Sequence, residues 1–301
     1  MAQQQELSIL EFKNKYGSED ACRKHLFKNK WPKGFICEKC GCFEYYYIAT
    51  RKSYECKGCC YQASVTSNTI MHKTHTTLEK WFWAIYLVAR DKRGLSALAL
   101  SKQIDVSYPT AWLMVQKLRE AMEYRDSNYK LANIVELDDA FFGSPDEGGK
   151  RGRGTSKMKV IIGISLTDKG KPQFAKMEVV DNIDSSTLKK NAQENIEPET
   201  TIKSDGYKSY CVLKKSGYEH TPIVVKGQDA AEVLHWVHII ISNAKAFING
   251  TFHGLGRKHF QRYLDEFCYR FNRRFWENQL FDRLLVACTT AKTITYTELT
   301  L

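Results

Sequence analysis

The 301-residue sequence contains no apolar run that approaches the roughly 18 residues needed to cross a lipid bilayer. Its first residues, MAQQQELSILEF, lack the basic head and apolar core of a secretion signal. Proline-rich stretches, low-complexity segments and internal repeats are also missing. These absences argue against membrane-spanning, fibrous and repeat proteins, and we expect a cytoplasmic protein with no membrane partner.

Acidic residues are scarce relative to basic ones. The chain has 45 Lys and Arg against 34 Asp and Glu, which leaves a formal charge of +11. A basic chain of this size favours a polyanionic partner, with nucleic acid ahead of a membrane surface. The length allows one large domain and one or two small ones.

Cysteine, in contrast, is concentrated in one short segment. Six of the ten cysteines lie between Cys37 and Cys60. Two CxxC pairs, Cys37 with Cys40 and Cys56 with Cys59, have the spacing of a four-thiolate zinc ribbon, which would bind a structural Zn²⁺. The alternative is that these thiols are merely reduced side chains. Cys42 and Cys60 lie beside the pairs and are possible substitute ligands.

Changes of pattern divide the chain into four ranges. FEYYYIA (43–49) and SYEC (53–56) are typical of short strands, and alternating strands and helices begin after residue 130. Three strands, a helix and a further strand favour an α/β domain with a mixed sheet. We expect a partly helical lead-in, a zinc ribbon, a helix-turn-helix domain and this α/β domain over residues 1–34, 35–70, 71–126 and 130–301.

The third range has helical periodicity. Thr76 with Glu79 predicts a capping box, and residues 95–104 and 108–122 predict a helix, a turn and a second helix capped by Ser107. A DNA-binding helix-turn-helix would direct polar side chains of the second helix to a groove. We expect Thr110, Lys117 and Arg119 in that role. An ordinary helical hairpin fits the pattern equally well.

Acidic residues within apolar strands are the candidate catalytic groups. In VELDDAF, strand alternation places Glu136 and Asp138 on one face and Asp139 on the other. Burial of an unpaired carboxylate costs several kcal/mol, and coordination of a divalent cation removes that cost. The alternative is an ion pair with one of the many lysines or arginines.

A second acid, Asp205, ends the strand TIKSDGY. Two acids on neighbouring strand ends can hold two Mg²⁺ or Mn²⁺ ions, which suits cleavage and joining of phosphodiesters. A third protein ligand is normally needed, and the helical segment LHWVHIIISNAKAFINGTFHGL offers Asn243 as a neutral oxygen ligand. Lys245, two residues further on, would neutralise phosphate charge.

Two further segments that carry basic residues could support this site. Glu266, Arg270 and Arg273 form a helical stripe that is either a salt-bridged surface or a support for the site and its phosphates. The loop GSPDEGGKRGRGTSK lies close to Asp138 in sequence and either clamps a DNA backbone or is merely solvated. Its clamp residues would be Lys150, Arg151 and Arg153.

In order along the chain, these segments resemble bacterial insertion-sequence transposases with an N-terminal zinc ribbon and a DDE-type, RNase H-like catalytic domain. The most specific matches are WVHIIISNAKAFINGTFHG and HFQRYLDEFCYRFNRR. The resemblance is to a subgroup with Asn and Lys at the third position, which implies Asp138, Asp205, Asn243 and Lys245 as its site. Two departures are Cys60, where glycine is common, and Asp139, where glutamate is usual.

The resemblance implies Mg²⁺-dependent hydrolysis at transposon ends and attack of the 3′-OH ends on target DNA, without a covalent protein–DNA intermediate. It also implies a homo-oligomer on double-stranded DNA, associated with the nucleoid. Two alternatives remain at this point. One is a zinc-ribbon DNA-binding regulator with a degenerate catalytic domain, suggested by the missing third carboxylate. The other is a nuclease that cuts but does not join DNA.

Overall fold

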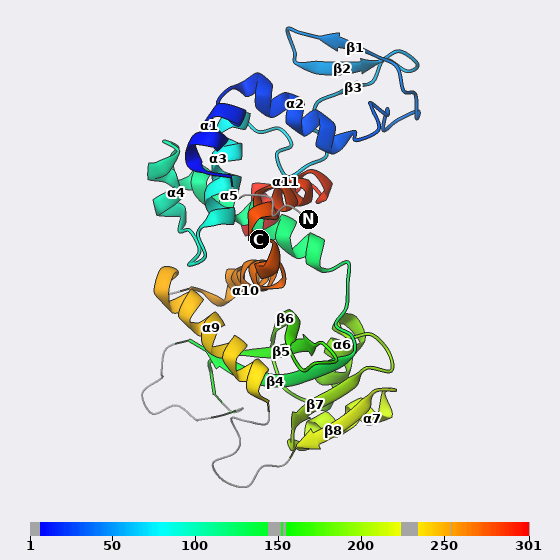
Figure 1. Cartoon of the computed structure of the whole chain (residues 1–301), viewed down its shortest axis with the longest axis vertical. Coiled ribbons are helices and arrows are strands. Elements are labelled where there is room, and N and C mark those ends of the chain that lie inside the picture. The colour runs from blue at the N-terminus through cyan, green and yellow to red at the C-terminus, as the bar shows by residue number, and fades with distance from the viewer. Residues whose placement is uncertain (1–6, 144–151, 153–154, 224–233, 254, 301) are drawn as a thin grey trace. The chain divides into compact units, whose positions relative to one another are not determined.

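The computed structural model describes residues 7–143, 152, 155–223, 234–253 and 255–300, and the chain forms two compact units (Figure 1). The first unit combines Met1–Arg125 with Phe275–Leu301, and the second is Asp126–Arg274. The sequence predicts one domain over residues 130–301, whereas residues 275–301 belong to the first unit. Across the described ranges, no helix is both long and apolar enough to span a membrane.

The first unit begins with two capped helices and a small sheet. Ser8 and Glu11 form a reciprocal capping box at α1 (Ile9–Tyr16), and Ser18 caps α2 (Glu19–Lys30). The lead-in is therefore helical in part, as expected. A three-stranded antiparallel sheet follows, with the order β1-β2-β3. Its strands are β1 (Tyr45–Ile48), β2 (Ser53–Cys56) and β3 (Gln62–Ala63).

Helix α3 (Leu78–Arg90) starts one residue later than the capping box predicted. Thr77, rather than Thr76, is the N-cap, and its hydroxyl accepts from the Lys80 N–H. The side chain of Glu19 on α2 accepts from the first two N–H groups of α3, which no local sequence pattern indicates. This carboxylate therefore stabilises the start of α3 and joins it to α2.

Helices α4 (Ala97–Gln103) and α5 (Tyr108–Asp126) occupy the two segments predicted to be helical, and Ser107 caps α5. Two of the three α5 residues that we expect to face DNA are buried. Arg119 is 2% exposed, and Lys117 is buried with its ammonium donating to the Ile70 carbonyl at 2.9 Å. These two side chains therefore cannot reach a DNA groove from this conformation, and burial lowers the pKa of Lys117.

The C-terminal residues complete the core of the first unit. After η3 (Arg274–Gln279), helix α11 (Leu280–Thr290) packs against α3 and α2, and α12 (Tyr296–Thr300) ends the described chain. Phe281 of α11 joins an aromatic cluster with Phe12, Tyr16 and Phe82, with ring centroids 5.3 to 6.0 Å apart. This burial of an amphipathic helix explains why residues 275–301 belong to the first unit.

The second unit is built on a five-stranded mixed sheet with the strand order β6-β5-β4-β7-β8. Strands β4, β5 and β6 form an antiparallel meander, while β7 and β8 run parallel to β4. The first four strands confirm the mixed sheet expected from the sequence. The strand bounds are β4 (Ile134–Phe142), β5 (Met158–Leu166), β6 (Pro172–Val180), β7 (Thr201–Asp205) and β8 (Glu219–Ile223).

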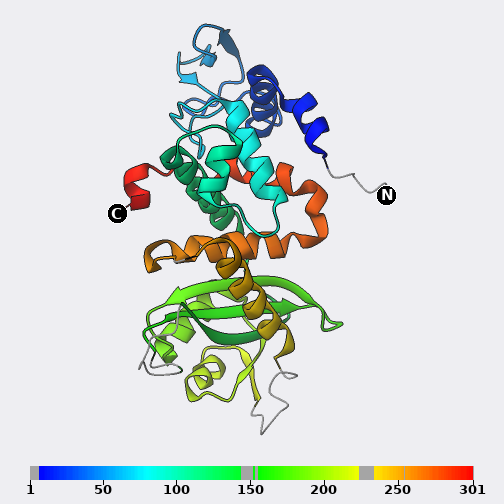
Figure 2. The same ribbon diagram turned by 90° about the vertical axis from the view of Figure 1, so that its left-hand side faces the viewer.

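Helices cover both faces of this sheet (Figure 2). One core contains inward side chains of β4 and β5 together with α9 and α10, and the other contains the opposite face of β4 with α6 and α7. Alternation along β4 therefore serves two separate cores. The helices are α6 (Ser185–Asn195), η2 (Lys208–Cys211), α7 (Val212–Lys215), α9 (His235–Thr251) and α10 (Arg257–Asn272).

Candidate active site and metal centre

Asp138 and Asp205 lie on adjacent parallel strands and on the same face of the sheet. Strands β4 and β7 pair Glu136 with Lys203 and Leu137 with Ser204. One further step of this register places Asp138 beside Asp205, about 4.8 Å away across the ladder. Both side chains then point to the face that α9 covers. The strand register thus brings together two residues that are 67 positions apart in sequence.

Both aspartates are held by local hydrogen bonds. Asp138 is 9% exposed, and its Oδ1 accepts from the Asp139 N–H at 2.8 Å. The Oδ1 of Asp205 accepts from the Tyr207 N–H at 3.1 Å, which shapes the turn after β7. Two carboxylates held on one face form a donor set of hard oxygens, and this set fits Mg²⁺ or Mn²⁺.

Asp139 confirms the predicted alternation along β4. Its carboxylate is on the opposite face of the strand and accepts from the Tyr210 hydroxyl at 3.3 Å. Val135 and Leu137 share that face and are buried against α6 and α7. Asp139 is therefore separated by the sheet itself from the site formed by Asp138 and Asp205.

Glu136 is a second buried acid on the site face, and it fixes the start of α9. It is 5% exposed, and its Oε2 accepts from the Val237 N–H at 2.9 Å, with a further bond from the Trp236 N–H. Helix α9 has no side-chain N-cap of its own. Burial raises the pKa of Glu136, opposed by these backbone hydrogen bonds. Glu136 thus caps the helix from a strand.

We expect Glu136→Ala to lower the free energy of unfolding by about 1 to 3 kcal/mol, because two helix N–H groups lose their buried acceptor. Glu136→Gln keeps an acceptor oxygen of the same shape, so its loss should be clearly smaller. Urea unfolding of both variants measures the difference. Equal losses in the two variants would show that a neutral acceptor oxygen at this position does not stabilise the start of α9.

Helix α9 carries the two remaining predicted residues, Asn243 and Lys245, whose side chains leave the helix in different directions. Asn243 and Lys245 are both exposed, and the Lys245 ammonium lies 5.7 Å from the Phe142 ring centroid. Phe142 is four residues beyond Asp138, about 13 Å along β4. His238 of α9 contacts Asp138, with Nδ1 3.7 Å from Oδ2. Sequence reasoning missed His238, since a histidine in an apolar helix gives no distinctive signal.

The stripe on α10 is buried rather than exposed. Glu266 is 1% exposed and accepts from Arg270 Nε and Nη2 at 3.0 and 2.8 Å. Arg273 donates to Asp126 at 2.7 Å and to the Tyr129 hydroxyl at 2.9 Å. These contacts hold α10 to the chain entering the second unit. They favour structural support over contact with phosphates. Of the predicted clamp residues, Lys150, Arg151 and Arg153 lie outside the described residues.

The two CxxC pairs of the first unit converge as predicted. One ligand atom from each of Cys37, Cys40, Cys56 and Cys59 lies within 4.8 Å of the others. The Cys37–Cys59 and Cys40–Cys56 sulfur distances are 3.6 and 3.4 Å. Tetrahedral Zn²⁺ with Zn–S bonds of 2.3 Å requires sulfurs about 3.8 Å apart, so the four thiols fit this ion.

Cys42 and Cys60 stay outside this cluster and have other roles. The Cys42 thiol donates to the Glu44 carbonyl, with 3.9 Å between sulfur and oxygen. The N–H of Cys60 donates to the Cys56 carbonyl, as the N–H of Gly41 does to the Cys37 carbonyl, and both residues have positive φ. The two knuckles are thus equivalent turns. This explains why glycine is common at the position of Cys60.

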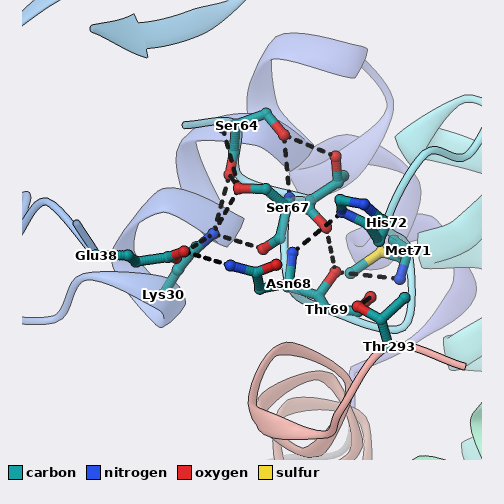
Figure 3. A network of polar contacts seen from close by, with 10 residues as sticks. Lys30, Glu38, Ser64, Ser67, Asn68, Thr69, Met71, His72 and Thr293 are labelled. Carbon is teal, nitrogen blue, oxygen red and sulfur yellow. Dashed lines mark hydrogen bonds and ion pairs between the residues drawn. The ribbon is translucent and has the colours of Figure 1, made fainter. Parts of the chain in front are cut away.

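A polar network joins the first knuckle to the helices of its unit (Figure 3). The Lys30 ammonium, at the end of α2, is paired with Glu38 at 3.0 Å and donates to the carbonyls of Ser64 and Ser67. Glu38, between Cys37 and Cys40, also accepts from Asn68. Burial lowers the pKa of Lys30, opposed by Glu38. The turn that holds Cys37 and Cys40 is therefore coupled to residues 64–68.

A mixed sheet with two in-register aspartates, joined to a four-thiolate ribbon, is the combination expected of a metal-dependent enzyme that acts on nucleic-acid phosphodiesters. Comparison with protein families agrees. Residues 130–272 match the ISXO2-like transposase domain, and residues 17–62 match the transposase zinc-ribbon domain. Together these ranges cover more than half of the chain. The chain belongs to the insertion-sequence transposases with an N-terminal zinc ribbon and a DDE-type catalytic domain.

Comparison with individual proteins gives the following similar chains. An uncharacterized protein in transposable element ISH50 of Halobacterium salinarum is 25% identical over 240 residues, 74% of this chain and 79% of that protein. Two solved structures are more distant. A chain of the simian T-cell lymphotropic virus intasome complex is 10% identical, with a TM-score of 0.31 over 57% of this chain and 63% of that one. A chain of a pre-cleavage Mos1 transpososome is 15% identical, with a TM-score of 0.28 over 70% and 79%.

Proposed function

We propose that this transposase cleaves the ends of its transposon and joins the resulting 3′-OH groups to target DNA, with Asp138 and Asp205 as its central catalytic residues. The observation that carries the proposal is the strand register that brings these two acids to one face of the sheet. A DNA-binding regulator would not need both carboxylates there. The family match likewise favours a transposase over a degenerate regulator.

Asp138 and Asp205 would hold two divalent ions, Mg²⁺ or Mn²⁺. The resemblance gives Asn243 as the third ligand, although helix periodicity puts it on a different side of α9 from His238, which contacts Asp138. Bound there, such ions supply stabilisation of charge on the attacking and leaving oxygens. The protein holds the two carboxylates by the Asp139 and Tyr207 N–H groups, so both point to the site before DNA arrives. Lys245, exposed on α9, would contact phosphate near the end of β4.

The first unit would recognise the terminal repeats through its zinc ribbon and the helix-turn-helix of α4 and α5. The exposed residues here include Lys102 and Gln103 at the end of α4 and Tyr108 at the start of α5. In such motifs the N-terminal residues of the second helix contact the bases. These residues take the place of Lys117 and Arg119, and Thr110 remains partly accessible beside them.

The remaining parts of the proposal concern the ion at the cysteines, the oligomer and the place of action. The ion at the four cysteines would be structural Zn²⁺, since a closed four-thiolate site leaves no position for substrate. Two transposon ends must be brought together, so we propose a homo-oligomer on double-stranded DNA. Its place of action would be the cytoplasm, at the nucleoid. The net charge of +11 supports binding to the DNA backbone.

The test is an assay of cleavage and strand transfer on labelled DNA that carries the element's own ends, with Mg²⁺ or Mn²⁺. We expect both cut ends and joined products, and neither with scrambled ends. Cut ends without joined products would indicate a nuclease. Binding without either product would refute the catalytic proposal and leave a DNA-binding protein.

A further inference from the structure

The contact between His238 and Asp138 is placed where the proposed reaction would take place. The His238 Nδ1 lies 3.7 Å from the Asp138 Oδ2, and the imidazole is 44% exposed. This distance is too long for a hydrogen bond, which rarely exceeds about 3.2 Å between nitrogen and oxygen. The two atoms therefore lie close together without a direct hydrogen bond between them.

Their spacing is suited to a shared cation. Ligands about 2.1 Å from an octahedral ion lie about 3.0 Å apart when adjacent and about 4.2 Å apart when opposite. The observed 3.7 Å is shorter than the opposite spacing, so both atoms lie within reach of one ion. A neutral imidazole offers one nitrogen lone pair, and imidazole with carboxylate is a common ligand pair for Mn²⁺ and related ions.

The position of His238 is fixed through its neighbour Val237. Its immediate neighbour Val237 donates its N–H to Glu136, two residues before Asp138 on the same strand face. Val237 itself is fully buried in the core beneath α9. Because both anchors are buried, the first turn of α9 has little freedom to carry His238 away from Asp138.

Helix geometry also separates His238 from Asn243. Five residues turn about 140° around an α-helix, so the two side chains leave α9 in different directions. Seven residues turn only about 20° short of two full turns, so Lys245 shares the side of His238. The side of α9 that contacts Asp138 is therefore the one carrying His238 and Lys245.

We propose that His238 is a ligand of the catalytic divalent cation, bound together with Asp138. The inference rests on the proposed function, and it adds a nitrogen donor to a site otherwise composed of oxygen ligands. A nitrogen ligand makes Mn²⁺ the better-matched probe, since Mg²⁺ strongly prefers oxygen.

The test measures Mn²⁺ binding to the full chain without DNA. Electron paramagnetic resonance gives the dissociation constant, and its pulsed form detects a directly coordinated imidazole ¹⁴N. We expect the nitrogen signal in the wild type and its loss in His238→Ala, with affinity weakened on the order of tenfold or more. His238→Asp should recover affinity without the nitrogen signal. His253→Ala, an exposed histidine beyond α9, is the matched control and should change neither.

The possible outcomes distinguish failure of the His238 assignment from failure of the proposed function. If Asp138→Asn abolishes Mn²⁺ binding but His238→Ala retains both the nitrogen signal and the affinity, His238 is not a ligand and the proposed function stands. If Mn²⁺ binding needs neither Asp138 nor Asp205 and the wild type does not cut DNA, both fail. Thermal unfolding without Mn²⁺ shows whether His238→Ala folds, and His238→Asp tests the assignment again if it does not.

Discussion

Asp138→Asn should lower the rate of end cleavage and of joining by at least about a thousandfold while leaving DNA binding unchanged. Carboxylate ligation of a catalytic metal is worth several kcal/mol in the transition state, and about 4 kcal/mol corresponds to three orders of magnitude in rate. Asparagine keeps the size of the side chain but removes its charge. Single-turnover cleavage of labelled ends, together with a gel-shift titration on the same DNA, measures both quantities.

Asp139→Asn is the matched control for this variant. It makes the same change of charge one residue away, but Asp139 lies on the opposite face of β4 with Tyr210. We expect its cleavage rate to stay within a few-fold of the wild type. Equal loss in both variants would mean that net charge or strand stability matters rather than metal ligation. Full activity of Asp138→Asn would refute the assignment of the site.

Periodicity made much of this fold predictable. Alternation in VELDDAF correctly placed Glu136 with Asp138 and set Asp139 on the other face, because a buried strand has only two faces. The CxxC spacing likewise predicted the cluster of Cys37, Cys40, Cys56 and Cys59, because a tetrahedral ion constrains which cysteines can meet. Strand β8 was missed, since Glu219–Ile223 is short, partly exposed and interrupted by Pro222.

What the sequence did not predict depends on contacts between distant residues. Glu136 caps α9 across 101 positions of sequence, and Glu19 caps α3 across 59. Neither acid has a local pattern that marks it as a cap. Lysine is a typical surface residue, yet Lys117 is buried and its ammonium donates to the Ile70 carbonyl. Tertiary packing therefore decided the roles of these charges, and also brought His238 to Asp138.

The metal-binding cysteines lead to the second large expected effect. Cys56→Ser should unfold the ribbon, because a structural zinc site contributes about 10 to 16 kcal/mol of apparent folding free energy in small zinc domains. Hydrogen exchange measures this residue by residue. We expect lost protection in β1–β3, whereas the strands β4–β7 of the second unit keep theirs, since they form a separate core. Cys42→Ser, outside the cluster, should leave all of these amides protected.

The loss should also spread beyond the ribbon along one defined route. Glu38 lies between the ligands Cys37 and Cys40 and holds both Lys30 and Asn68. When the knuckle unfolds, the Lys30 ammonium loses its counter-charge while its surroundings remain partly buried, which weakens its bonds to Ser64 and Ser67. Residues 64–72 should therefore exchange faster in Cys56→Ser. Unchanged protection there would show that these bonds persist without the metal, and that the ribbon unfolds independently of its helical neighbours.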